Sequence, residues 1–185
     1  MKFPFWDEIT PRHEVIKSFF KYLREQLPNI KISADLFGLS TINNNDLGIG
    51  QIIEDAYEYF DYVAPMVYPS HYAKMFLGYK NPSQYPYEVI KYSMDSALNK
   101  LMIYNRQLTI NSNSTSTENL KPNTYNLKTK LRPWLQDFAL GSDYDAKMIK
   151  KEIQAVYDSA SSTPELINGW MLWNPSNIYT REALE

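Results

Sequence analysis

The stretch NIKISADLFG, residues 29–38, carries more information about the fold than any other part of the chain. It is short, apolar and closed by a glycine, a combination typical of a buried β-strand. Asp35 places a polar side chain near the carboxyl end of that strand. The stretch YVAPMVY, residues 62–68, predicts a second buried strand, although Pro65 removes a donor from its ladder. Residues 48–59 lie between them with helical apolar spacing, which indicates a parallel sheet.

Helices and strands alternate on both sides of this central pair. Thr10-Pro11 is typical of an N-cap followed by a first-turn proline, and predicts a helix that ends before Pro28. Further helices are expected at 87–101, at 144–160 and from residue 181, and further strands at 131–138 and 169–173. We therefore predict an α/β fold with about four parallel strands alternating with helices, which is half of a (β/α)8 TIM barrel. An open doubly wound sheet is the alternative.

A single partial barrel domain is expected over residues 1–185. Residues 105–130 interrupt its pattern, since they contain few apolar side chains and the low-complexity string NSNSTST at 111–117. This composition predicts a long polar loop, with residues 111–120 mobile.

Composition excludes several classes of function. The formal net charge is −2, which does not favour nucleic acid as a partner. The absence of cysteine excludes disulfides and thiolate metal sites. His13 and His71 are the two histidines and do not form a metal-binding pattern, and Gly48-x-Gly50 lacks the third glycine of a nucleotide loop, so no cofactor is expected. No signal peptide or membrane span is expected in this chain, and its location stays open.

Two carboxylates are candidates for catalysis because each follows a predicted strand. Active sites of (β/α)8 barrels lie at the carboxyl ends of the strands, where Asp35 and Asp137 are expected. Asp35 could instead form an Asx turn before Gly38, and Asp137 could simply begin a loop. Because side chains alternate along a strand, only one of Gln136 and Asp137 can face the barrel interior.

Aromatic and amide side chains at the same strand ends are candidates for sugar binding. Aromatic residues make up 15% of the chain, and sugars present flat C–H faces together with hydroxyl groups. The candidates are Tyr68, His71, Trp134, Gln136, Trp173, Asn174 and Asn177. Core packing and loop capping are the alternative roles for these residues.

Five strings in order carry a resemblance to a known family. They are SADLFG at 33–38, DLGIGQ at 46–51, YVAPMVYPSHY at 62–72, LRPWLQDF at 131–138 and LWNPSN at 172–177. The chain resembles the C-terminal half of a bacterial glycoside hydrolase domain family, formerly a domain of unknown function, within the TIM-barrel glycosidase superfamily. The resemblance implies hydrolysis of O-glycosidic bonds in a polysaccharide by carboxylate acid–base chemistry, and an extracytoplasmic or cell-envelope location for full-length relatives.

The resemblance also implies that part of the barrel is contributed from elsewhere. The family carries an aspartate just before an Arg-Phe-Pro string, and Lys2-Phe3-Pro4 is similar to the tail of that region. We therefore expect this fragment to be inactive alone and to pair with the missing N-terminal half of the barrel or with a second copy. A non-catalytic glycan-binding half-barrel and a purely structural one are the alternatives.

Overall fold

The computed structural model describes residues 7, 9–114 and 129–185, with side chains in 111–114 left aside. The strands are β1 (Ser33–Phe37), β2 (Tyr62–Met66), β3 (Lys130–Leu131), β4 (Trp134–Gln136) and β5 (Met171–Trp173). The α-helices are α1 (Arg12–Gln26), α2 (Ile53–Tyr57), α3 (Pro86–Ser114) and α4 (Ala146–Ser159). Short 3-10 helices are η1 (Gly38–Thr41), η2 (Pro69–His71), η3 (Phe76–Gly78), η4 (Pro82–Gln84), η5 (Pro164–Leu166) and η6 (Arg181–Ala183).

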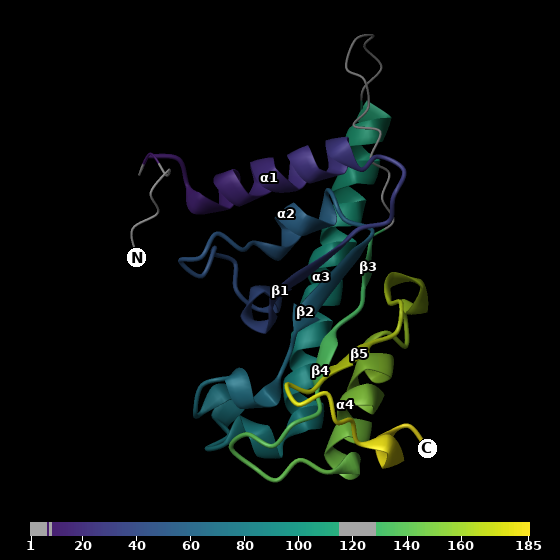
Figure 1. Cartoon of the computed structure of the whole chain (residues 1–185). Coiled ribbons are helices and arrows are strands. Elements are labelled where there is room, and N and C mark those ends of the chain that lie inside the picture. The colour runs from purple at the N-terminus through teal and green to yellow at the C-terminus, as the bar shows by residue number, and fades with distance from the viewer. Residues whose placement is uncertain (1–6, 8, 115–128) are drawn as a thin grey trace.

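The strands form one parallel sheet in the order β1-β2-β4-β5, with β3 also paired to β2 (Figure 1). The α/β prediction is confirmed, and the arrangement is consistent with half of a TIM barrel. β3 and β4 act as one continuous strand, since the Arg132 N–H donates to the carbonyl of Val63 and the Pro133 carbonyl accepts from Met171 N–H. All the carboxyl ends of the strands therefore lie at one edge of the sheet.

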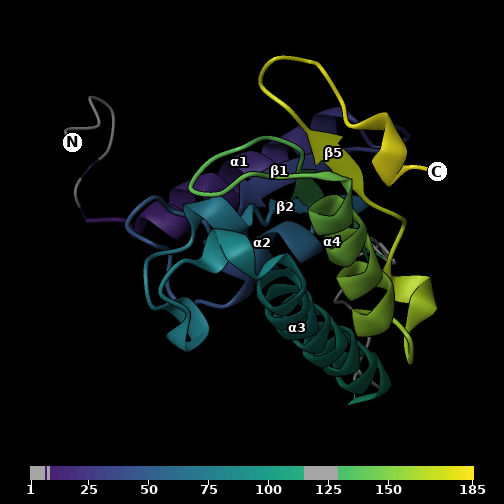
Figure 2. The same ribbon diagram turned by 90° about the horizontal axis from the view of Figure 1, so that it is seen from below.

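Alternation along the strands separates a helix-covered face from an open face. Leu36, Val63 and Leu135 point into the core, where α2, α3 and α4 cover the sheet (Figure 2). Along β1 the exposed residues are Ser33, Asp35 and Phe37, which alternate with buried ones. We call the face that bears these residues the open face.

The helix predicted at 48–59 is wrong in its first half, because α2 begins only at Ile53. Gly48 and Gly50 have φ values of 68° and 82°, in the left-handed region that glycine tolerates. A Cβ on Gly50 would lie 3.0 Å from the carbonyl oxygen of Arg12. These glycines thus allow the loop to approach the first turn of α1 closely.

The predicted polar loop at 105–130 is wrong over its first ten positions, because α3 continues to Ser114. A helix that is already formed gains one hydrogen bond for each residue added, so polar residues extend it readily. Residues 115–128 lie outside the described part of the chain, as does most of the stretch predicted to be mobile at 111–120. Lys2-Phe3-Pro4 also lies outside it.

Other boundaries shift by a few residues. Pro11, rather than Thr10, is the N-cap of α1, and Thr10 donates its hydroxyl to Asp7. The C-terminal segment predicted to begin a helix forms only the short 3-10 helix η6. Among the helices described, none is long and apolar enough to cross a membrane.

A buried arginine fastens α1 to the sheet. Arg24 is 3% exposed, and its Nη2 contacts Asp61 Oδ2 at 2.7 Å. Its Nε donates to the carbonyl of Tyr59 at 2.7 Å, and its Nη1 donates to the carbonyls of Leu27 and Ile30. Asp61 Oδ2 also accepts from the N–H of Ile32, just before β1. One guanidinium therefore fixes the end of α1, the end of α2 and the entry to β1.

Replacing Arg24 with methionine is expected to destabilise the chain by about 3–5 kcal/mol, because the Asp61 carboxylate and several carbonyls would lose their donor. Urea unfolding followed by circular dichroism measures this. Lys21→Ala on the exposed side of α1 is the matched control and should change stability by less than about 0.5 kcal/mol. Similar losses in the two variants would contradict a fastening role for Arg24.

Candidate active site

Asp35 lies on the open face and is held by a side chain from two strands away. Its Oδ1 accepts a hydrogen bond from Trp134 Nε1 at 3.0 Å. Ala64 of β2 is in register with Asp35, and its small side chain leaves room for the indole to cross. Asp35 is exposed, and its Oδ2 has no hydrogen-bond partner among the described residues. The contact orients one carboxylate oxygen and leaves the other available.

Two tryptophans form an aromatic surface beside this carboxylate. The ring centroids of Trp134 and Trp173 are 6.1 Å apart, and their planes meet at 85°. Trp173 is 43% exposed, and it pairs with Gln136 across β4 and β5. Asp35, Trp134 and Trp173 thus come from three different strands and share the open face.

Tyr68 and His71 form a second aromatic group with Phe138. The ring centroids of Tyr68 lie 5.1 Å from His71 and 5.6 Å from Phe138, both edge-on. Burial raises the pKa of Tyr68 well above its usual value, and the charges of Asp35 and Glu152 raise it further. Burial also lowers the pKa of His71, which favours the neutral imidazole at pH 7.

Gln136 holds the loop that carries this second group. Its Oε1 accepts from the N–H of Ser70 at 3.1 Å, and its Nε2 donates to the carbonyl of Phe138 at 2.8 Å. The residue is fully buried. Its amide is therefore committed to the protein, and these contacts support a positioning role instead of the direct sugar contact predicted from the sequence.

Asp137 is buried, and both of its carboxylate oxygens are hydrogen-bonded. It is 2% exposed, its Oδ2 accepts from the Thr180 N–H at 2.8 Å, and its Oδ1 accepts from the Thr180 hydroxyl at 2.7 Å. Both oxygens are thus used to anchor the segment that follows β5. The contacts of Asp137 are those of a loop anchor, whereas Asp35 is exposed.

Asn174 and Asn177 shape the turn after β5. Asn174 donates its amide to the carbonyl of Asp137, and its Oδ1 accepts from the N–H of Ser176 at 2.8 Å. Asn177 has a φ of 54° and donates its N–H to the carbonyl of Asn174 at 3.0 Å. The side chain of Asn177 is exposed, whereas both ends of the Asn174 amide are hydrogen-bonded within the turn.

Sequence reasoning missed Glu152, a fully buried acid on α4. Its Oε2 accepts from the Gln136 N–H at 2.9 Å, and its Oε1 accepts from the hydroxyl of Tyr144. Burial raises the pKa of Glu152 well above 4.5, although both hydrogen bonds act in the opposite direction. A signal was present, since Glu152 lies three residues after Ile149 and four before Val156, on the apolar face of the helix.

Arg132 was also missed. The register that pairs Val63 with Leu131 and Met66 with Trp134 places Arg132 beside Ala64, on the open face. Its Nε is buried and has no hydrogen-bond partner among the described residues. The signal was its even-numbered spacing from Trp134 on one strand, because residues two apart share a face.

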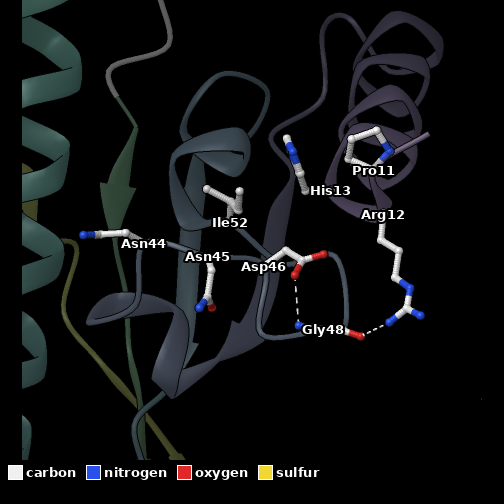
Figure 3. Close-up of a pocket in the computed structure, with 8 residues that line it drawn as sticks. All are labelled: Pro11, Arg12, His13, Asn44, Asn45, Asp46, Gly48 and Ile52. Carbon is white, nitrogen blue, oxygen red and sulfur yellow. Dashed lines mark hydrogen bonds between the residues drawn. The ribbon is translucent and has the colours of Figure 1, made fainter. Parts of the chain in front are cut away.

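A cavity of about 520 Å³ lies between the first turn of α1 and the loop that follows β1 (Figure 3). Its polar lining includes Arg12, His13 and Asp46. Figure 3 shows these side chains pointing in different directions, with Arg12 and Asp46 both bonded to the backbone of Gly48. Among the described residues, no group of three acidic, histidine or cysteine side chains is arranged to hold a metal ion.

A comparison with known families gives this geometry a context. Residues 1–179 match a family described as "Putative glycosyl hydrolase domain". The chain belongs to this family. Neither the curated proteins nor the solved structures searched gave a match. The resemblance found in the sequence is confirmed, and membership implies a carbohydrate as the substrate.

The buried Glu152 should make stability depend on pH. A carboxyl whose folded pKa is raised is easier to ionise in the unfolded chain, so stability falls as pH rises above about 4.5 towards the folded pKa. Glu152→Gln removes this loss. Urea unfolding should show the variant gaining on the wild type between pH 4.5 and 7.5, by at most about 1.4 kcal/mol per pH unit. The exposed Glu165→Gln should show no such trend, and a flat difference for Glu152→Gln would contradict the assignment.

Proposed function

We propose that this chain forms one side of the active site of an enzyme that hydrolyses O-glycosidic bonds in a polysaccharide, with Asp35 as its reacting carboxylate. The observation that carries the proposal is the exposed Asp35 held by the indole of Trp134 beside Trp173. A carboxylate next to an aromatic surface matches the chemistry of a sugar ring, whose C–H faces stack while its glycosidic oxygen accepts a proton.

The aromatic residues have distinct places in this proposal. Trp134 and Trp173 supply the surface on which a sugar ring stacks. Tyr68 and His71 form a side wall, held in place through Gln136. The exposed Asn177 lies at the rim after β5, and the turn built by Asn174 sets its position.

The second carboxyl group comes from outside the described strands. Glycoside hydrolysis of the usual kind needs two carboxyl groups on either side of the scissile bond. On the open face of the described strands, Asp35 is the one acidic side chain. Asp137 is buried and bound to Thr180. A segment that closes the sheet into a barrel would face Asp35 and could contribute the missing acid.

Glycan binding without hydrolysis is the second candidate function. The observation in its favour is the same single acid on the open face, because an aromatic surface binds a sugar without a catalytic pair. Loss of the Asp35 carboxylate would then leave binding intact, whereas loss of Trp173 would not. This difference separates the two functions.

An assay on mixed polysaccharides tests the proposal. This chain alone is expected to show no turnover, and a version extended by the first half of the barrel is expected to be active. Asp35→Asn in the extended version should lower the rate by about 10²-fold or more, because acid–base and nucleophilic catalysis each contribute that much. Asp143→Asn, in an exposed loop, is the matched control and should keep full activity.

Two results would each contradict one part of this proposal. Equal turnover by the short and extended chains would mean that the catalytic set is complete here. An active Asp35→Asn variant would remove this carboxylate from the chemistry. Retention of polysaccharide by that variant in an affinity gel, with no turnover in any version, would favour the binding function.

A further inference from the structure

One face of α3 carries amide side chains that the fold does not use. Asn99 and Gln107 are two steps of four residues apart with Ile103 between them, so all three lie on the same side of the helix. In the described part of the chain, neither side-chain amide has a hydrogen-bond partner. Both amides therefore keep a donor and an acceptor for a further molecule.

This face of α3 borders a second cavity of about 520 Å³, whose other walls come from α2 and from the loop after η1. Sites that hold small molecules commonly have volumes of about 300–1,000 Å³. Figure 3 shows the Asn44 side chain of that loop pointing away from Arg12 and Asp46. We call this space the helix-side cavity, and its lining includes Ile42, Asn44, Glu54, Asn99, Tyr104 and Gln107.

The charges of the helix-side cavity are already paired. Lys100 is 11% exposed, and its Nζ lies 3.3 Å from Glu54 Oε1. The same ammonium donates to the carbonyl of Asn43. The other lining side chains are uncharged. An anion would have to compete with Glu54 for the ammonium, so the cavity favours a neutral ligand.

One acceptor in this lining has no donor. Glu54 Oε2 is enclosed and has no hydrogen-bond partner among the described residues. A carboxylate oxygen shut away from donors costs free energy, which a ligand hydroxyl recovers. The terminal torsion of glutamate is broad, so a small rotation turns this oxygen towards a hydroxyl in the cavity.

Tyr104 gives the cavity an aromatic wall. Its ring centroid lies 6.0 Å from that of the fully buried Tyr57, which holds it in place. Burial raises the pKa of Tyr104 to about 12, so its hydroxyl keeps the proton at pH 7 and can donate it. Ile42 and Ile103 add apolar surface. Amides, an unpaired carboxylate oxygen and an aromatic ring together match the hydroxyl groups and C–H faces of a sugar.

We propose that the helix-side cavity is a second carbohydrate-binding site, which takes a neutral sugar through Glu54, Asn99 and Gln107. Helices α2 and α3 cover the side of the sheet opposite the open face that bears Asp35 (Figure 2). One molecule of this chain can therefore hold a sugar there while the open face meets another part of a glycan. The proposal goes beyond the proposed function and does not depend on hydrolysis.

A ¹⁵N–¹H spectrum with assigned side-chain amides tests the proposal on this chain. Cellotriose and maltotriose are the neutral probes, and trigalacturonate is the charged one. We expect at least one neutral trimer to shift the amide signals of Asn99 and Gln107 saturably. The dissociation constant of trigalacturonate should be at least ~10-fold larger, because Glu54 repels it and Lys100 is engaged.

Two variants examine the roles of the lining residues. The double variant Asn99→Ala/Gln107→Ala should weaken binding of the neutral trimer about 10-fold or more, read from the Ile103 backbone N–H, because two hydrogen-bonding amides are lost. Gln154→Ala, an exposed amide on α4, is the matched control and should keep the wild-type affinity. Glu54→Gln should narrow the preference for neutral trimers, because Lys100 is then available to a carboxylate.

Three outcomes overturn the proposal. The first is the absence of a saturable shift of Asn99 and Gln107 with either neutral trimer. The second is an unchanged affinity in the double variant. The third is a wild type that binds trigalacturonate as tightly as the neutral trimers, which would remove the neutral-ligand assignment. The indole signals of Trp134 and Trp173 report the open face in the same spectra, so binding at the proposed active site is scored separately.

Discussion

The hydrogen bond from Trp134 to Asp35 depends on the strict alternation of side chains along parallel strands, and so does the rest of the structure. On β1 and β4 one set of residues enters the helix-covered core while the other set faces outward. The outward set then carries the carboxylate, the indoles and Arg132. Asp137 follows the last residue of β4 and is bound by Thr180 instead. Of the two acidic residues at the strand ends, Asp35 is therefore placed to meet a substrate, and Asp137 supports a loop.

The fold could be predicted well because its signals are local. The stretches around Ala34 and Val63 are apolar runs between helical patterns, and they form neighbouring parallel strands. Errors arose where packing over long distances decides the structure. Gly50 adopts a left-handed conformation and lies against the first turn of α1, and the residues around Gly50 do not reveal that distant contact. The continuation of α3 to Ser114 is a different case, because propagation of a helix that is already formed extends it through polar residues.

The candidate site was harder to predict for a related reason. The position of Asp35 at a strand end follows from the sequence, but its bond to Trp134 joins residues 99 positions apart. The sequence offered Gln136 as a sugar-binding residue and Asp137 as a catalytic one. Their hydrogen bonds in the structure indicate that Gln136 holds a loop and that Asp137 anchors the segment after β5. Glu152 of α4 accepts a hydrogen bond from the Gln136 N–H. Helix periodicity predicts that Glu152 faces inward, but it does not identify Gln136 as the partner.

We propose that Asp35, Trp134 and Trp173 form one carbohydrate-facing surface. The most direct measurement is a ¹⁵N–¹H spectrum of the indole N–H groups during titration with polysaccharide-derived oligosaccharides. The Trp134 and Trp173 signals should move together, and Asp35→Asn should displace the Trp134 signal before any sugar is added. Trp170, whose indole faces the Tyr157 hydroxyl at 3.3 Å, should stay unchanged. Movement of Trp170 alone, or a Trp134 signal indifferent to Asp35→Asn, would contradict the account.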